Sequence, residues 1–141
     1  MELEELVNEK GLLDVTFGSM RSEIVATFGA PEDWTEAGSL ILRYGDLQLT
    51  FGEDGGLWLA TIWNVAGRLR LRSKNVDVDW RVSVERCTSL LAGVGLDVTV
   101  GHERSPLLIA GSGAYYRAEG IFDDQGSLEK LSLVGCLESA G

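Results

Sequence analysis

The sequence is poor in the residues that metal sites and thiol chemistry need. Its 141 residues include two cysteines, Cys87 and Cys136, and one histidine, His102. The two cysteines have no metal-type spacing, which excludes the common zinc and redox motifs. We expect both to be reduced, with Cys87 packing as a small hydrophobe in the apolar stripe of a helix. A disulfide between the two is the alternative.

Recognised catalytic motifs are missing as well. The chain contains no GxSxG, HExxH, Walker or dinucleotide-binding pattern. His102 lies in a polar segment, where a solvated or capping role is simpler than catalysis. The acidic pairs Glu53-Asp54 and Asp123-Asp124 occupy equivalent hairpin tips, which is typical of turns. We therefore predict no enzyme activity, no cofactor and no metal. An unrecognised carboxylate site is kept as a third hypothesis.

Long apolar runs and a basic N-terminal leader are also absent. No stretch approaches the roughly 20 apolar residues that a membrane-spanning helix needs. The first residues, Met1 to Glu5, are acidic where a secretory leader is basic. We therefore expect a cytoplasmic protein that does not bind membranes.

Basic residues are scarce in this chain. It has 12 lysines and arginines against 22 aspartates and glutamates, a formal net charge of −10. Because each phosphate contact needs a cation, this balance disfavours binding to nucleic acid. It favours a basic protein partner, although acidic charge also serves solubility alone.

Against these absences stands an internal repeat. A helix-strand-strand rhythm in the first half is replayed in the second half. The strand residues of the second half lie 71 positions after their counterparts in the first half. Tyr44, Phe51, Leu57 and Ile62 correspond in this way to Tyr115, Phe122, Leu128 and Leu133. The helix of the second half lies only 62 positions after that of the first half, so the second copy has a longer loop between its helix and its hairpin. We predict a single compact domain over residues 1–141, made of two pseudo-repeats at about 12–66 and 76–136.

Apolar spacing and turn residues predict the elements. Helices are expected over residues 2–9, about 20–28 and from the cap residue Ser83 onward. Strands are expected over residues 39–44, 47–51, 57–64, 96–100, 107–110, 115–122 and 128–134. Helices followed by strands, twice over, indicate an α+β fold, with the helices packed on one face of an antiparallel sheet and the other face open.

An alternating charge pattern lies between the repeats. Arginines alternate with leucines before Lys74-Asn75, and aspartates alternate with apolar residues after it. If that dipeptide is the turn, Arg72 lies opposite Asp77. Arg70 then lies opposite Asp79. Cross-strand pairs of opposite charge contribute roughly 0.2–1 kcal/mol each, which favours a structural ladder over an anion site. We expect this hairpin to join the two halves into one sheet.

Aromatic residues are numerous, with four tryptophans and three tyrosines. Both types are enriched at binding hot spots, although core packing is an equally good explanation for any one of them. Trp58 and Trp63 differ in strand parity, so without a bulge one faces the helices and the other faces outward. Tyr115 and Tyr116 are adjacent and must also point to opposite faces. We expect at least one tryptophan and one tyrosine on the open face, inside an acidic rim that attracts a basic partner.

The first repeat carries a motif that resembles known families. Its residues are Gly18-Ser19-Met20-Arg21-Ser22-Glu23-Ile24, then Phe28-Gly29-Ala30-Pro31, then the strand Tyr44 to Phe51. This pattern resembles the small α+β modules of the β-lactamase-inhibitor-protein and outer-membrane-assembly lipoprotein group. It is also similar to immunity-type proteins of bacterial toxin systems. The match covers about residues 18–63, and the second half lacks the Gly-x-Pro stop. The resemblance implies a tandem module whose concave sheet face binds another protein, without the lipobox cysteine or secretion signal of an envelope protein.

These features together favour a bacterial immunity or inhibitor protein that neutralises a toxin domain by direct, non-catalytic binding. The candidate partner-binding residues are Trp34, Asp46, Gln48, Trp58, Tyr116 and Glu119. The alternative hypothesis is a small-ligand or lipid-binding α+β module. A deep apolar cavity would favour that alternative, and a packed interior would argue against it.

Overall fold

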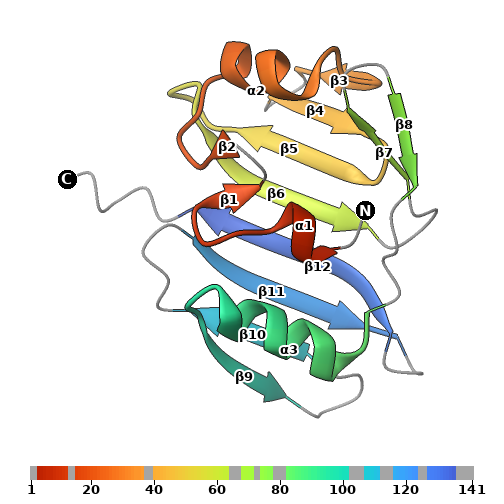
Figure 1. Cartoon of the computed structure of the whole chain (residues 1–141). Coiled ribbons are helices and arrows are strands. Elements are labelled where there is room, and N and C mark those ends of the chain that lie inside the picture. The colour runs from red at the N-terminus through yellow and green to blue at the C-terminus, as the bar shows by residue number, and fades with distance from the viewer. Residues whose placement is uncertain are drawn as a thin grey trace.

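A computed structural model describes residues 3–12, 15–36, 40–63, 68–71, 74–77, 82–101, 107–111, 116–123 and 127–135. Over these residues the fold is α+β, with three helices and a large antiparallel sheet (Figure 1). The helices are α1 (Leu3–Leu6), α2 (Arg21–Phe28) and α3 (Val84–Gly93). The α+β class predicted from the sequence is therefore confirmed.

At the start of each of the two longer helices, a side chain accepts a hydrogen bond from a free backbone amide. At α3, the Ser83 side chain accepts a hydrogen bond from the amide of Arg86 at 3.1 Å, as its sequence position predicts. At α2, the N-cap residue is Met20, and the Glu23 carboxylate accepts a hydrogen bond from its amide at 3.1 Å. The two helices therefore start by different local chemistry.

The large sheet has eight strands in the order β3-β4-β5-β6-β12-β11-β10-β9, and every neighbouring pair is antiparallel. On one side the strands are β3 (Asp33–Thr35), β4 (Leu40–Tyr44), β5 (Leu47–Phe51) and β6 (Leu57–Trp63). On the other side they are β9 (Asp97–Gly101), β10 (Leu107–Gly111), β11 (Tyr116–Phe122) and β12 (Leu128–Gly135). The short strands β1 (Gly11–Leu12) and β2 (Val15–Thr16) form a separate pair.

The two halves of the chain meet at the centre of this sheet. Strand β6 pairs with β12, and Thr61 lies opposite Ser132. The hairpin β7 (Arg68–Leu71) and β8 (Lys74–Asp77) is a separate two-stranded sheet. The prediction that this hairpin joins the halves is therefore wrong, because the junction is made by strands far apart in the sequence.

The charged hairpin also has a different register from the one the sequence suggests. Leu71 lies opposite Lys74, so Lys74 belongs to strand β8 and not to a turn. Arg68 then lies opposite Asp77, and Arg70 lies opposite Asn75. This register places Leu69 directly opposite Val76, which pairs apolar with apolar. Residues Arg72 and Asp79 of the predicted ladder lie outside the described residues.

The same pairing pattern occurs on both sides of the central β6–β12 pair. In β5–β6, Phe51 lies opposite Leu57, and the register shifts beside Phe51. In β11–β12, Phe122 lies opposite Leu128, and the register shifts beside Phe122. Each residue of the second pair is 71 positions from its counterpart in the first. The offset found in the sequence therefore also relates the registers and the irregularities of the two hairpins.

The helices connect to these hairpins through equivalent hydrogen bonds. The amide of Leu57 donates to the carbonyl of Ser19 at 2.8 Å, and the amide of Leu128 donates to the carbonyl of Val82 at 2.9 Å. Ser19 and Val82 are 63 positions apart, so the structure relates the helices by one residue more than the sequence comparison predicts. The buried helix residues follow this offset of 63: Ile24 with Cys87, and Phe28 with Leu91.

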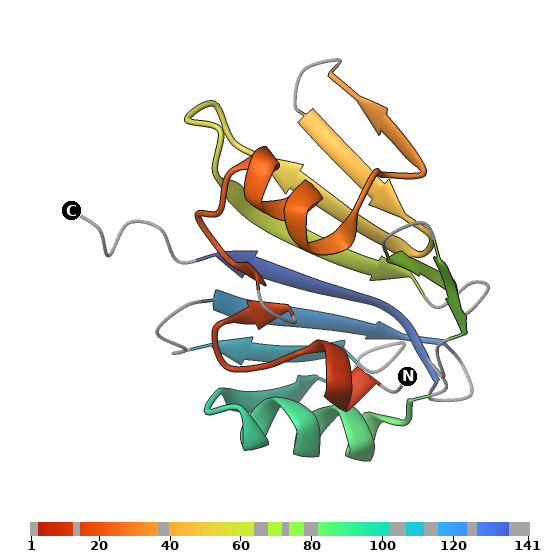
Figure 2. The same ribbon diagram turned by 45° about the horizontal axis from the view of Figure 1, so that its top comes forward.

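Buried apolar side chains from helices and strands form one cluster. It includes Leu6, Ile24, Phe28, Cys87 and Leu91 from the helices, and Leu42, Leu47, Leu49, Ala60, Ile62, Leu131 and Leu133 from the strands. The ribbons of the three helices lie in front of the large sheet in Figure 1 and in the turned view of Figure 2. Arg86 of α3 also donates two hydrogen bonds to Glu4 of α1, at 2.9 and 2.8 Å.

Two buried tyrosines connect strands to the segments that precede them. The Tyr44 hydroxyl donates to the carbonyl of Gly29 at 2.8 Å, and the Tyr116 hydroxyl donates to the carbonyl of Asn8 at 2.7 Å. Burial raises the pKa of each phenol to about 12, although Arg21 partly opposes this for Tyr44. Both hydroxyls therefore remain donors over the physiological pH range.

Candidate functional site

One face of the large sheet carries a row of polar residues. Arg43, Gln48, Thr61, Ser132 and Glu119 lie directly opposite one another in the consecutive strands β4, β5, β6, β12 and β11. Residues paired in this way point to the same side of a sheet. Their alternating neighbours, such as Leu42, Leu49, Ala60 and Leu133, belong to the core cluster. We call the side that carries this polar row the outer face.

The outer face is hollowed where it crosses the first half. A depression of about 260 Å³ is lined by Arg43, Gly45, Asp46, Gln48 and Trp63. A neighbouring depression of about 160 Å³ is lined by Asp33, Trp34, Thr35, Ile41, Arg43 and Gln48. The two share Arg43 and Gln48, so they lie next to each other across β3 to β6. We refer to the two depressions together as the first-half groove.

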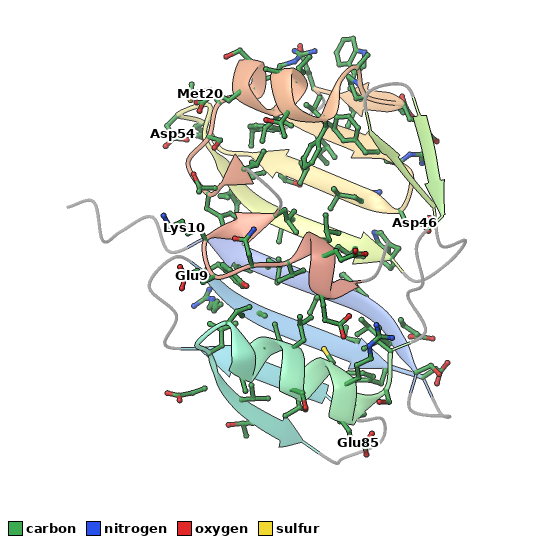
Figure 3. All side chains as sticks on the ribbon, viewed as in Figure 1. Glu9, Lys10, Met20, Asp46, Asp54 and Glu85 are labelled. Atoms are coloured by element: carbon green, nitrogen blue, oxygen red, sulfur yellow. The ribbon has the colours of Figure 1, made fainter. Side chains whose placement is uncertain are left out.

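Backbone geometry at the β4–β5 turn shapes one end of this groove. Gly45 has φ 64°, a left-handed conformation that glycine adopts without steric cost. The carbonyl of Asp46 accepts a hydrogen bond from the amide of Trp63 at 2.9 Å. This bond holds the turn against the end of β6. Figure 3 places Asp46 near the end of these strands, away from Met20 and Asp54 at the opposite end.

An ion pair positions the arginine of the groove. Arg43 Nη2 lies 3.1 Å from Glu32 Oε1, and Glu32 Oε2 accepts a hydrogen bond from the amide of Gly45 at 3.2 Å. Both charged side chains remain partly exposed, so the pair contributes only about 0–1 kcal/mol to stability. Its main consequence is to orient the Arg43 guanidinium between the turn and β3.

Two exposed tryptophans near the groove carry cations on their rings, one on each side of the sheet. The Lys130 ammonium lies 4.9 Å from the ring centroid of Trp63, which is 38% exposed and lies on the outer face. The Arg21 guanidinium carbon lies 5.5 Å from the ring centroid of Trp34, which is 54% exposed. Trp34 pairs with the core residue Leu42, so its ring lies on the helix side of the sheet edge. The aromatic surface of the groove on the outer face is therefore that of Trp63, held by a cation–π contact.

The structure brings three of the predicted partner-binding residues together. Asp46 and Gln48 line the first-half groove, and Trp34 borders its β3 end with its ring turned toward Arg21 of α2. Glu119 is exposed on the outer face, 71 positions from Gln48, and does not line either depression. Trp58 is half-buried and lies at the register shift of β5–β6, outside the groove.

Tyr116 requires a correction. Its side chain is 1% exposed, and its ring centroid lies 5.6 Å from that of Phe17. Strand parity puts Tyr116 on the same side as the core residue Ala118, facing the helices. The prediction that Tyr116 contacts a partner is therefore wrong for this fold. Its neighbour Tyr115 lies outside the described residues.

Sequence reasoning missed two residues that dominate the groove, Arg43 and Trp63. The sequence does contain a sign that Arg43 lies on the outer face. Arg43 directly precedes the apolar Tyr44, and it lies across the turn from the polar Gln48. The sequence does not fix which way Trp63 faces, because the parity of its strand depends on whether a bulge is present. The register does shift between Phe51 and Thr50, and neither Trp58 nor Trp63 is in the buried core.

The outer face carries charges of both signs. Over the described residues, Arg43, Arg117 and Lys130 share this face with the acidic residues Asp33, Asp46, Asp97 and Glu119. The acidic residues expected from the sequence are therefore interspersed with three cations. The face offers cations, anions and the exposed ring of Trp63 close together.

Other candidates for chemistry are weak over the described residues. Cys87 is fully buried, and burial raises the pKa of its thiol to about 12, which makes it a poor nucleophile. Within the described ranges, no group of three or more histidine, cysteine, aspartate or glutamate side chains is placed to hold a metal ion. Residues His102, Asp124 and Cys136 lie outside those ranges. None of the described helices has the length and apolar character needed to cross a membrane.

No known protein family, curated protein or solved structure matches this chain.

Proposed function

We propose that this chain is a non-catalytic inhibitor of the immunity-protein type, which binds a toxin domain of a bacterial system in the cytoplasm. The observation that carries the proposal is the first-half groove, where Trp63, Arg43, Gln48 and Asp46 meet on the outer face. Exposed tryptophan and arginine side chains beside a hollow are typical of binding hot spots. The resemblance of the first repeat to immunity-type proteins points the same way.

The proposed scaffold is a pair of tandem units whose helices pack on one face and leave the outer face to the partner. The shared offset of 71 positions between the two hairpins supports this arrangement. The central register supports it too, because Leu59–Val134 and Trp63–Lys130 are equivalent pairs about the Thr61–Ser132 pair. A sheet of this kind offers a broad, rigid surface, which suits a protein partner more than a small substrate.

Charge acts at two ranges in this proposal. The net charge of −10 accelerates the encounter with a basic toxin domain through long-range attraction. At contact, the groove presents Arg43 and Lys130 together with Asp46 and the exposed ring of Trp63. We therefore expect the partner segment that binds this groove to carry positive charges, negative charges and apolar groups. Specificity comes from this local pattern, and the rate of encounter comes from the overall field.

The alternative, a lipid-binding or small-ligand module, is less well supported. The two depressions of the groove are open to solvent, and most of their lining residues are polar or charged. A lipid tail needs an enclosed apolar cavity. The open, polar lining therefore favours a protein surface as the occupant.

The proposal is tested by co-expressing this chain with the product of the neighbouring reading frame in the native host. We expect the chain to relieve toxicity and to co-purify with that product. Trp63→Ala should abolish both effects, whereas Val134→Ala, at the equivalent position 71 residues later, should retain them. Absence of any toxic neighbour or co-purifying protein, or equal behaviour of the two variants, would contradict the proposal.

A further inference from the structure

The large sheet ends in two edge strands of unequal character. Strand β3 has three residues, and β9 has five. Over the described residues, β9 pairs only with β10, which makes it an edge strand of the large sheet. It contains no proline and one charged residue, Asp97. Natural proteins usually shorten or charge such an edge, because it can pair with another chain.

We propose that β9 pairs antiparallel with β9 of a second copy of this chain, about a two-fold axis at Thr99. This self-association uses a surface separate from the first-half groove and does not depend on the proposed inhibitor function. The result is one continuous sheet across two subunits. An interface of this type is isologous, so the same residues contribute from both copies.

The order of residues in β9 supports pairing with itself. The segment Val98-Thr99-Val100 reads the same in both directions. With Thr99 on the axis, Val98 lies opposite the second copy's Val100, and Asp97 lies opposite its Gly101. Cross-strand pairs of β-branched residues stabilise antiparallel strands, and this register keeps the two Asp97 carboxylates from facing each other. The edge is therefore complementary to its own copy.

The opposite edge offers less for such pairing. Strand β3 has three residues against the five of β9, so it can form fewer hydrogen bonds with another chain. Its central side chain, Trp34, is already in contact with Arg21 of α2. A second copy paired at β9 is therefore the arrangement that the sheet favours.

Strand β9 is also held in place for pairing. The amide of Leu96 donates to the carbonyl of Leu91 at 3.0 Å, which fixes the entry to β9 against the end of α3. Side chains of Asp97 and Thr99 are exposed, and Val98 packs against the core cluster. Since β9 lies at the far end of the sheet from β3 (Figure 1), pairing there leaves the first-half groove accessible.

Sedimentation velocity of the full chain from about 1 µM to about 1 mM tests the proposal, a range that covers weak association. We expect a monomer–dimer equilibrium that shifts toward dimer at higher salt, because each subunit carries a charge of −10. Thr99→Lys and Thr99→Glu each place like charges on the axis and should weaken the dimer at least tenfold. Mixed in equal amounts, the two variants should form a heterodimer.

Ser22→Lys, an exposed position on α2, is the matched control for the added charge and should dimerise like the unmodified chain. Hydrogen exchange of the unmodified chain gives a readout that needs no variant: protection of residues 97–101 should rise with concentration, while that of residues 33–35 should not. A chain that stays monomeric up to 1 mM would overturn the proposal. Dimers that persist in both Thr99 variants, or a mixture that stays monomeric, would overturn it as well.

Discussion

The two halves of this molecule share a framework and differ on its outer face. The hairpins β5–β6 and β11–β12 have the same register and the same irregularity, 71 positions apart. At equivalent outer positions, however, Gln48 is replaced by Glu119 and Trp63 by Val134. The buried positions are kept apolar while the exposed ones have diverged. The two hairpins therefore have equivalent registers, and the proposed partner contact lies on the first of them.

The largest expected effect concerns the shared framework. Phe51 and Phe122 are equivalent and each is 1% exposed. We expect Phe51→Ala and Phe122→Ala each to lower the free energy of unfolding by about 3–5 kcal/mol. Urea unfolding followed by circular dichroism measures both. A difference of more than about 2 kcal/mol between the two would break the equivalence of the halves, because equal burial predicts similar losses.

The next effect concerns the first-half groove. Trp63→Ala should weaken binding of the proposed partner by at least about 2 kcal/mol, a loss typical of a hot spot. Val134→Ala should change it by less than about 0.5 kcal/mol, as expected outside the contact region. Isothermal titration calorimetry with the purified partner measures the dissociation constants. If both variants lost the same binding free energy, the partner would contact the centre of the sheet and not the groove.

A smaller effect separates the two helix starts. Ser83→Ala removes a side-chain cap from α3 and should cost about 1 kcal/mol of folding free energy. Met20→Ala in α2 keeps the hydrogen bond from the backbone amide of residue 20 to the Glu23 carboxylate. Its loss of folding free energy should therefore come only from the contacts of the half-exposed Met20 side chain. Thermal unfolding of both variants compares the two starts. A larger loss for Met20→Ala would show that side-chain packing matters more there than capping.

The last effect is absent at neutral pH and is a pH dependence that both halves should show. Burial raises the pKa of Tyr44 and of Tyr116 from the ordinary value of 10.0 to about 12 in the folded state. The folded state thus retains these protons more strongly, so their contribution is fully present below pH 10 and is lost as pH rises toward 12. Tyr44→Phe and Tyr116→Phe should each flatten the fall in stability over this range, measured by denaturant unfolding at successive pH values. A slope that neither variant changes would contradict the assignment.

Local patterns in the sequence predicted the elements better than their partners. The alternation around Leu47, Leu49 and Phe51 defines a half-buried strand without any knowledge of the rest of the fold. No local pattern states that β6 pairs with β12, because that contact joins residues about 71 positions apart. The prediction therefore assigned the junction to the nearest hairpin.

The errors in the candidate site have a common physical origin. The facing of a strand residue changes with every single-residue shift in register. The sequence does not fix the parity of the Tyr115-Tyr116 pair, so it does not show that Tyr116 faces the core. A bulge resets parity within β6, so the sequence does not fix the facing of Trp63 either. Trp34 and Asp46 lie at an edge strand and a turn, where residues are accessible in either register, and Gln48 follows from the alternation of Leu47 and Leu49 around it.

The central β6–β12 pairing has a consequence for how the sheet is assembled. These two strands meet about the Thr61–Ser132 pair and belong to the same polypeptide. Covalent connection makes their encounter intramolecular, with an effective local concentration far above that of separate molecules. The broad surface on which both halves contribute therefore exists at any dilution, even though the pairing itself resembles that between two subunits.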